Sequence, residues 1–528
     1  MKPSGARAAE HDSQEADMRV EDQTEVLEFL GNPASYGMPD GTRVATAGTH
    51  ISSIFLVGRC AFKLKRAVQL PYVDFSTAAR RLAACRDEVR LNRRTAPMLY
   101  TGVRRITREA DGRLAFDGQG ELVDAVVEMN RFDQRDVFEE RAAQGRLDPA
   151  MLTELARVVA RTHDHAGVVH RRGGAAGIAT VLDGNERALD GAHFLPAGLG
   201  AALSAGLRAA FHGHEALLDA RERAGKVRWC HGDLHLRNIC LIDGKPVLFD
   251  CLEFDEAMAT IDVLYDLAFL VMDLWRHGLR SEANLVFNRY LDERDEVEGL
   301  PLMPFFMAMR AGIRAHVTAE QAGRATGPRR AALVSEAQAY AVLAMRLLAP
   351  VPGRMVAIGG LSGTGKSTVA AAIADQVGPA PGARVLESDR IRKRLHGVRA
   401  EARLSEQAYR PAVSARVYAD LARDARAVLD SRHAVVVDAV FERMACRECI
   451  ERVAREACVP FTGIWLHARA QTLLARVDAR RGDASDATAE VVRAQMAAQS
   501  GPVPWVRIDA DAPPGEVAAR VMRAMETT

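Results

Sequence analysis

The chain has 528 residues, of which 48% are apolar, so it is long enough for roughly two to four domains with sizeable cores. Its 70 lysines and arginines nearly balance its 69 aspartates and glutamates, and the net charge of +1 excludes a global field that favours nucleic acid or membrane. No apolar run approaches the roughly 18 residues needed to span a bilayer, so no membrane partner is expected.

The first 24 residues are polar and acidic, unlike a signal peptide, and are expected to form a disordered tail. The eight cysteines follow no disulfide-framework spacing, which predicts reduced thiols in the cytoplasm. Cys446 and Cys449 form a Cys-x-x-Cys pair that invites a redox or zinc interpretation. Because the pair lies in a helical pattern without a partner pair, a structural role is predicted.

Further along the chain, residues 51–58 and 60–66 read as paired strands, and helical patterns dominate from about residue 150. Residues 302–349 repeat their apolar side chains at a spacing near 3.6, which predicts helices. Two prolines and a glycine then interrupt the pattern, and a linker is predicted at residues 350–354. The last domain is expected to cover residues 355–528.

The segment WCHGDLHLRN and the short strand after it carry the first chemical signature. Asp233 and Asn238 are five residues apart, and Asp250 ends the following strand. An aspartate can accept the proton of an attacking hydroxyl, while an asparagine and a second aspartate can hold Mg²⁺ against a triphosphate. The spacing therefore predicts a catalytic Asp233 and a magnesium site at Asn238 and Asp250. The alternative is that His231, Asp233 and His235 form a polar turn that caps a helix.

The wording His-Gly-Asp-Leu-His-x-x-Asn resembles the aminoglycoside phosphotransferase and choline kinase branch of the protein-kinase-like fold. The resemblance covers about residues 25–349. It implies a small lobe over about 25–130 and a helical large lobe over about 131–349. It also implies that the segment containing Asp262 and Asp266 braces the catalytic loop.

The same resemblance implies a lysine on the third strand of the small lobe, paired with Glu88 on the next helix and aimed at the nucleotide phosphates. Lys63 and Lys65 both lie on the expected strand and point to the same face. Ala61-x-Lys63 matches the kinase pattern better, so Lys63 is the predicted phosphate-binding lysine. Lys65 stays an alternative.

The second chemical signature is MVAIGGLSGTGKST at residues 355–368, in which an apolar strand leads into the spacing Gly-x-x-x-x-Gly-Lys-Ser. Glycines let successive N–H groups turn toward phosphate oxygens. Lys366 is expected to reach the β- and γ-phosphates as a catalytic cation, and Ser367 to bind Mg²⁺. The predicted nucleotide-binding residues are Gly360, Ser362, Gly363, Thr364, Gly365, Lys366, Ser367 and Thr368.

Two more apolar strands in this part of the chain end in aspartates, Asp389 and Asp438, where open parallel sheets bind ligands. The pattern resembles the small P-loop kinases related to gluconate and shikimate kinases, polynucleotide kinase and the zeta-type toxins. This resemblance implies that Asp389 accepts the proton of the substrate hydroxyl and that Arg392 holds an anionic substrate. It implies that Asp438 assists Mg²⁺ or substrate; a strand-end cap is the alternative.

Arg480 follows a helical segment and precedes an acidic loop. As a lid arginine it would neutralise charge on the transferring phosphoryl group, which makes it a predicted catalytic residue. The alternative is a solvated helix face. Asp483 and Asp486 are expected to cap the next helix. Because no stacked aromatic residues interleave with the basic ones, a nucleic-acid groove is not predicted.

Together these patterns predict an α/β and α+β multidomain chain, with an N-terminal two-lobed protein-kinase-like fold and a C-terminal P-loop kinase fold whose parallel sheet is flanked by helices. The predicted function is an ATP- and Mg²⁺-dependent phosphotransferase with two sites that act on hydroxyl groups of small molecules. In one alternative, one domain senses nucleotide and regulates the other. In another, the C-terminal domain is a toxin-like or nucleic-acid-end kinase. Both acceptors and the oligomeric state stay open.

Overall fold

The structure is a computed structural model that describes residues 20–48, 51–70, 73–171, 173–192, 194–253, 256–479, 484–498 and 502–526. The chain forms two compact units, each assembled from several segments. The first unit comprises Met1–Val181, Leu218–Leu270 and Thr318–Ser335, and the second comprises Leu182–Leu217, Val271–Val317 and Glu336–Thr528. The boundaries expected at residues 24, 349 and 355 stay predictions. Residues 1–19 of the expected tail lie outside the described residues.

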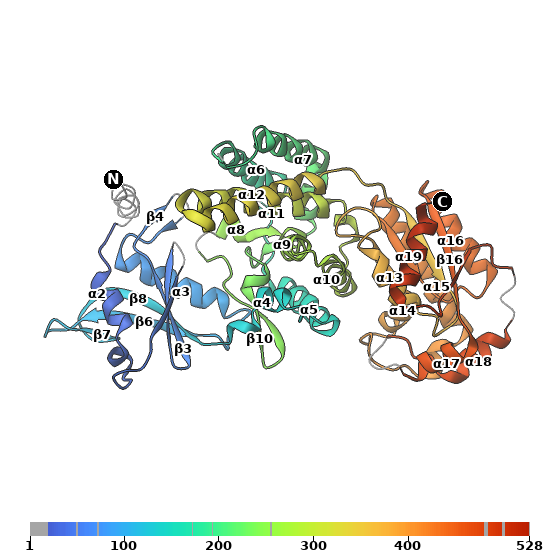
Figure 1. The fold of residues 1–528 in the computed structure, drawn as a ribbon, viewed down its shortest axis with the longest axis horizontal. Helices are drawn as coiled ribbons and strands as arrows, with labels where there is room; N and C mark the ends of the chain where they lie inside the picture. Colours follow the sequence, from blue (N-terminus) through green and yellow to red (C-terminus); the bar gives the residue numbers. More distant parts are fainter. Residues whose placement is uncertain are drawn as a thin grey trace, which may run out of the picture. The chain divides into compact units, whose positions relative to one another are not determined.

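The first unit begins with a six-stranded antiparallel sheet in the order β1-β2-β3-β8-β6-β7 (Figure 1). A separate short pair joins β4 (Gln69–Leu70) to β5 (Val73–Asp74). The strands of the large sheet are β1 (Ala45–Gly48), β2 (Ser52–Val57), β3 (Cys60–Lys65), β6 (Tyr100–Arg108), β7 (Leu114–Phe116) and β8 (Glu121–Asn130).

Strand alternation divides this sheet into two faces with separate cores. Ala61 and Val127 pack with helix α3 (Ala78–Asn92), whereas Phe62 and Val126 pack with helix α2 (Thr24–Gly31). Odd-numbered residues of β3 therefore face α3. This alternation is what carries Lys63 to the helix that bears Glu88.

Residues 20–24, which the sequence analysis assigned to the tail, contact this sheet in the described part of the chain. The Gln23 side-chain amide donates hydrogen bonds to the Lys65 carbonyl (3.0 Å) and to Asp124 Oδ2 (2.8 Å). The backbone N–H of Val20 donates to the Ala67 carbonyl at 3.1 Å. The segment before α2 is therefore held by side-chain and backbone hydrogen bonds.

The predicted catalytic loop lies between two short antiparallel pairs in the first unit. Strand β9 (Val227–Trp229) pairs with β12 (Thr260–Asp262), and β10 (Ile239–Ile242) pairs with β11 (Lys245–Leu248). Asp233 falls between β9 and β10, and Asp250 follows β11 directly. Helices α4 (Phe138–Ala143), α5 (Pro149–His165) and α8 (Glu256–Ala259) contact these strands.

Five helices contain a boundary between the two units, so each of them has one part in the first unit and the other part in the second. The helical pattern predicted over residues 302–349 is confirmed by the last two of them. Within the described residues no helix is long and apolar enough to cross a membrane. The five helices are α6 (Ala175–Asp190), α7 (Leu199–Arg223), α9 (Val263–Arg276), α11 (Leu302–Arg324) and α12 (Gly327–Leu347).

The second unit contains a five-stranded parallel sheet in the order β14-β15-β13-β16-β17, so the predicted P-loop kinase fold is confirmed. Strands β13 and β15 are parallel neighbours in which Ile358 lies opposite Asp438, so the carboxyl ends of these two strands lie at the same edge of the sheet. The strands are β13 (Met355–Gly359), β14 (Arg384–Glu387), β15 (Val435–Asp438), β16 (Phe461–His467) and β17 (Val506–Asp509).

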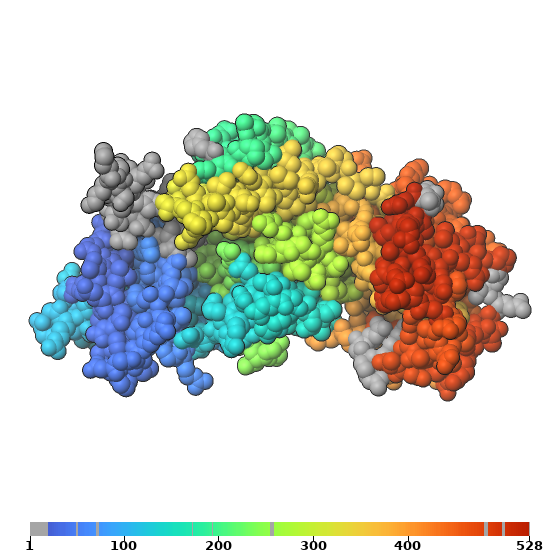
Figure 2. Space-filling view, in the orientation of Figure 1, coloured from blue at the N-terminus to red at the C-terminus, as the bar shows by residue number. Residues whose placement is uncertain are grey.

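Helices flank both faces of this sheet. Helices α13 and α19 share one apolar core with the strands, and Figure 2 shows α19 in dark red on the near surface. Helices α15 and α16 contact each other and strands β14, β15 and β16 outside that core. Cys446 and Cys449 lie on α16 as free thiols. The helices are α10 (Arg280–Glu293), α13 (Lys366–Ala374), α14 (Ser388–Leu395), α15 (Pro411–Asp430), α16 (Met444–Glu456), α17 (Ala470–Asp478), α18 (Ala489–Ala497) and α19 (Pro514–Glu526).

Candidate active sites

The lysine and glutamate predicted to grip a nucleotide in the first unit form an ion pair. Lys63 Nζ on β3 lies 2.8 Å from Glu88 Oε1 on α3, and the same ammonium lies 2.7 Å from Asp250 Oδ1. Although burial opposes its charge, the carboxylates of Asp250 and Glu88 raise the pKa of Lys63 well above its usual value. Lys63 is therefore a fixed cation beside the predicted metal ligand Asp250.

Lys65 occupies a different position on the same face of β3. Its ammonium lies 2.8 Å from Glu88 Oε2 and 2.9 Å from Glu253 Oε1, and its side chain is only 1% exposed. Burial tends to raise the pKa of Glu88, but the ammonium groups of Lys63 and Lys65 lower it to about 2. One glutamate thus pairs with two lysines, and Lys63 forms a further ion pair with Asp250.

The three polar residues of the predicted catalytic loop converge. Asn238 Nδ2 donates hydrogen bonds to Asp233 Oδ2 (2.9 Å) and to the Asp233 carbonyl (3.0 Å), and it lies 3.4 Å from the Asp250 carbonyl. The Asp233 side chain is 40% exposed, so an incoming hydroxyl can reach it. The predicted capping alternative is only partly met, because the His235 side chain accepts from Arg237 N at a short 3₁₀ turn.

Of the two acidic residues expected to brace the loop, Asp266 does so by accepting backbone hydrogen bonds. Asp266, which is fully buried, accepts the N–H groups of His231 (3.2 Å) and Gly232 (2.9 Å). Asp262 forms two hydrogen bonds with Arg221, at 2.6 and 2.8 Å. The two Asp266 hydrogen bonds hold the turn directly before Asp233.

Two residues that the sequence analysis missed hold Asp250 in place. Asp250 has a positive φ of 58°, a conformation that non-glycine residues rarely adopt. Its N–H donates to the Tyr100 hydroxyl at 3.1 Å, and the next N–H, of Cys251, donates to Asn92 Oδ1 at 2.9 Å. Tyr100 and Asn92 are remote in sequence and belong to no motif, so no local pattern could have identified them.

The donor set around the loop suits Mg²⁺, which prefers oxygen ligands. Asp250 offers a partly exposed carboxylate. Asn238 uses its amide nitrogen toward Asp233, and among the described residues its amide oxygen accepts no hydrogen bond. Both oxygens are therefore compatible with a bound magnesium ion.

The phosphate-binding loop of the second unit requires its glycines. Gly360 and Gly363 have φ values of 140° and 90°, and a Cβ atom would lie 2.5 Å from the Leu466 carbonyl or 2.7 Å from the Leu473 carbonyl. Gly365, with a φ of 86°, is the N-terminal cap of α13. The loop therefore leads directly into the N-terminus of α13, the positive end of the helix dipole, where phosphate groups bind.

The predicted nucleotide and metal residues of this loop meet a buried carboxylate. The Ser367 hydroxyl donates a hydrogen bond to Asp438 Oδ2. Burial raises the pKa of Asp438 to about 7, with Lys366 opposing and Glu387 reinforcing the rise. A serine hydroxyl and a carboxylate in contact are oxygen donors of the kind that Mg²⁺ binds in P-loop enzymes. The alternative role of Asp438 as a strand-end cap does not account for this contact with Ser367.

Asp389 and Arg392 both lie on α14, next to the loop. Burial raises the pKa of Asp389, and a hydrogen bond from Ser485 counteracts the rise. Arg392 Nη1 donates to the Ala408 carbonyl at 2.7 Å, and its guanidinium stacks over the Tyr409 ring at 4.6 Å. The arginine expected to hold an acceptor anion is thus already oriented by protein groups.

The expectation that Asp486 caps the next helix is wrong. Thr488 is the N-terminal cap of α18, where its hydroxyl accepts from Val491 N. Asp486 instead accepts hydrogen bonds from Lys393 (2.6 Å) and from the Tyr409 hydroxyl (2.7 Å). It is used there because a buried lysine requires a counter-charge. Arg480 and Asp483 lie outside the described residues.

Comparison with known proteins finds a family match in each part of the chain. Residues 75–300 match the family model described as "Phosphotransferase enzyme family", and residues 355–502 match one described as "AAA domain". Two solved structures are similar in part. A choline/ethanolamine kinase family protein from Mesorhizobium loti is 13% identical, covering 58% of this chain and 92% of that one with a TM-score of 0.37. A gluconokinase from Sinorhizobium meliloti is 23% identical, covering 34% and 94% with a TM-score of 0.24.

The fold and the two family matches define a kinase-type phosphotransferase with two kinase-type domains. Uncharacterised proteins of Mycobacterium tuberculosis and Mycobacterium bovis are each 30% identical to this chain over 484 residues. The match covers 88% of this chain and 92% of each relative. The chain belongs to the same family as these mycobacterial proteins.

Proposed function

We propose that this phosphotransferase has two ATP- and Mg²⁺-dependent sites, each of which transfers the γ-phosphoryl group to a hydroxyl of a small molecule. The observation that carries the proposal is that each unit gathers its own lysine and its own set of oxygen donors. Lys63 lies beside Asp250 in the first unit, and Lys366 acts on the pKa of Asp438 in the second. A phosphoryl-transfer site needs both a cation and a metal position.

In the first unit, the Asp233 carboxylate is the base. It accepts the proton of the acceptor hydroxyl as that oxygen forms a bond to the γ-phosphorus, and the bond to the bridging oxygen of ADP breaks. Asn238 and Asp250 would hold Mg²⁺, which supplies charge neutralisation on the phosphates. Lys63, fixed by Glu88, grips the α- and β-phosphates.

In the second unit, the same bond exchange is assigned to other residues. Asp389 takes the proton, and its raised pKa makes it a stronger base than an ordinary carboxylate. Lys366 and the N–H groups of residues 360–368 bind the phosphates, and Ser367 and Asp438 would hold the metal. Arg392 orients an anionic acceptor. Arg480 stays a proposed lid residue.

The eight cysteines are all free thiols in the structure. Reduced thiols are usual in the cytoplasm, where disulfides are rare. We therefore assign both reactions to the cytoplasm.

The test uses two variants of the full chain, Asp233→Asn and Asp389→Asn. ATP consumption is screened against sugars, amino alcohols, aminoglycosides and nucleosides. If both halves are kinases, each variant loses a different activity and keeps the other. An aspartate whose loss leaves every acceptor-dependent activity intact identifies a half that only senses nucleotide, and the proposal for that half is then wrong.

A further inference from the structure

Strand β14 is an edge of the parallel sheet, because its only neighbour in the sheet order is β15. An uncovered edge would present unpaired N–H and C=O groups. In the second unit, helix α10 covers this edge with two buried asparagines, one turn apart. Asn288 Oδ1 accepts the Val385 N–H at 2.7 Å, and the amide groups of Asn288 and Asn284 both donate to the Ala383 carbonyl at 3.1 Å. The side-chain amides of the two asparagines thus form hydrogen bonds that a neighbouring strand would otherwise form with the backbone of this edge.

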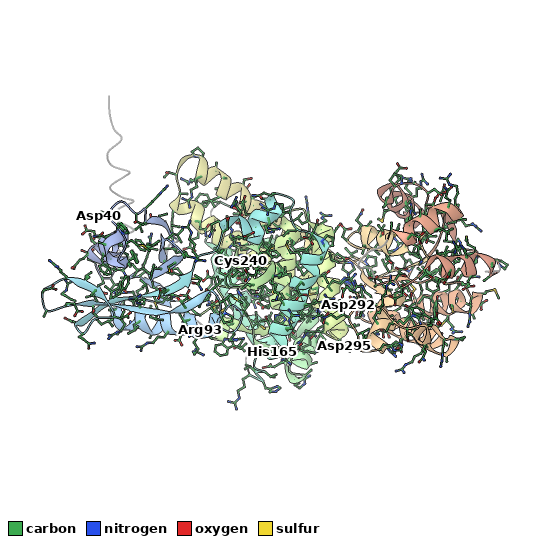
Figure 3. All side chains as sticks on the ribbon, turned by 90° about the horizontal axis from the view of Figure 1, so that it is seen from below. Asp40, Arg93, His165, Cys240, Asp292 and Asp295 are labelled. Atoms are coloured by element: carbon green, nitrogen blue, oxygen red, sulfur yellow. The ribbon has the colours of Figure 1, made fainter. Side chains whose placement is uncertain are left out.

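A cluster of five charged side chains continues this contact along the edge, with Asp292 labelled in Figure 3. Arg289 Nη1 lies 2.6 Å from Asp292 Oδ2, and Arg289 Nη2 lies 2.9 Å from Glu387 Oε1. Arg384 donates to Asp292 at 2.7 Å, and Arg390 donates to Glu387 at 2.9 Å. Although burial opposes it, Arg384 and Arg289 lower the pKa of Asp292 to about 2. The cluster is therefore a charged clamp between α10 and the end of β14.

The clamp ends next to the proposed acceptor site. Glu387 is the last residue of β14 and lies directly before helix α14, whose second residue is Asp389. The Glu387 charge acts on both Asp389 and Asp438, raising the pKa of each alongside the larger effect of burial. A side chain that holds Glu387 in place therefore also fixes the position of the first turn of α14, which carries Asp389.

We propose that Arg289 is a positioning residue for the P-loop site, which it serves by fixing Glu387 and thereby Asp389. The inference rests on the function proposed above for the second unit. Helix α10 lies within residues 75–300, the segment matched by the phosphotransferase family model. The P-loop kinase is thus completed by a helix from the other family domain, and residues 353–528 alone lack part of its acceptor side.

The test keeps the full chain and silences the first site with Asp250→Ala. In this parent we compare Arg289→Ala, Arg289→Lys and the control Arg280→Ala, an exposed arginine of α10 that stacks on Trp275. Three quantities are measured: ATP turnover, affinity for a non-hydrolysable ATP analogue with Mg²⁺, and hydrogen exchange of residues 385–392. We expect Arg289→Ala to lower turnover by about tenfold, because small displacements of a reacting group cost this much.

Analogue affinity should fall less than turnover, because the clamp acts through Glu387 on the acceptor-side residue Asp389. Exchange should rise only at residues 385–392. The lysine variant should recover part of the turnover, since it keeps the charge, and the control should match the parent. Combining Arg289→Ala with Asp389→Asn should add no further loss, because both act through one carboxylate.

Unchanged turnover and exchange in Arg289→Ala would overturn the inference. So would an additive loss in the double variant, or a fall in analogue affinity equal to the fall in turnover, because either result indicates a general structural role. If the parent turns over no ATP, the proposed function of this site is wrong. The exchange comparison then decides by itself whether Arg289 holds the start of α14.

Discussion

Lys63 Nζ lies 2.7 Å from Asp250 Oδ1, although the two residues are separated by most of the kinase-like part of the chain. The same ammonium is held by Glu88, so it connects strand β3, helix α3 and the residue that follows β11. Both members of the pair have proposed nucleotide partners, the phosphates for Lys63 and magnesium for Asp250. Nucleotide binding is therefore expected to exchange this ion pair for two contacts with the ligand.

The two lysines of β3 should respond differently to replacement. In a chain whose P-loop site is silenced by Lys366→Ala, Lys63→Met should weaken Mg²⁺–nucleotide binding about tenfold or more, because it removes a charged phosphate contact. Lys65→Met should instead destabilise the fold by about 3–5 kcal/mol, because Glu253 is left as a buried, unpaired carboxylate. Calorimetry and urea unfolding distinguish the two. If Lys65→Met abolishes binding while its unfolding is normal, the phosphate-binding lysine is Lys65.

The stability of the second unit should depend on pH through Asp438. Its pKa in the folded protein is about 7, above the usual value of about 3.9 for an unfolded chain. A raised carboxyl pKa favours the folded state at low pH, and this contribution is lost as pH rises from about 4 through 7. The difference between the folded and unfolded pKa values corresponds to about 4 kcal/mol in the free energy of unfolding. Asp438→Asn, which stays neutral, should therefore be more stable than the parent by an amount that grows with pH.

Urea unfolding at pH 5 and pH 8 in the presence of EDTA measures this difference. EDTA is needed because a bound metal would favour the charged carboxylate. The comparison with Asp438→Asn isolates one residue from other buried groups, such as His433, whose pKa burial lowers to about 4. A gap between the two proteins that is equal at both pH values would contradict the expectation.

The two asparagines of α10 offer a matched pair. Asn288→Ala leaves the Val385 N–H without its acceptor at a buried edge, which costs about 1–3 kcal/mol. Asn284→Ala removes donors from the Pro381 and Ala383 carbonyls, which tolerate incomplete pairing better than an N–H does. Hydrogen exchange at Val385 should therefore rise more in Asn288→Ala. Equal exchange in the two variants would show that the amide oxygen is not the decisive contact.

Local patterns sufficed to locate the residues that we propose to carry the chemistry. The phosphate-binding loop and the His-Gly-Asp-Leu-His motif each concentrate their functional groups within a few residues, so spacing alone identifies them. Strand alternation also placed Lys63 and Lys65 on one face, as the structure has them. It did not decide between them, because that choice depends on where Asp250 and Glu253 return to the sheet.

The parts that escaped prediction depend on contacts between remote segments. Tyr100 and Asn92 reach Asp250 and Cys251 only because α3 and β6 pack near the end of β11. The clamp joins Arg289 to Glu387, 98 positions further along the chain. Two asparagines in a helix carry no sequence signal for the strand edge that they cover. Asp486 looked like a helix cap by sequence position, but the charge of Lys393 outweighed that local preference.

A last contact bears on how nucleotide enters the P-loop. Gln495 Oε1 on α18 accepts the Ser362 N–H at 2.9 Å, so a side-chain oxygen occupies a loop donor. Gln495→Ala should strengthen analogue binding several-fold, because losing one hydrogen bond of about 1 kcal/mol favours the open loop. Gln495→Glu should weaken binding, because a carboxylate near the phosphates repels them. Calorimetry on both variants, with exposed Met496→Ala as the control, measures the effect. Identical affinities for the alanine and glutamate variants would show that Gln495 leaves this position before nucleotide binds.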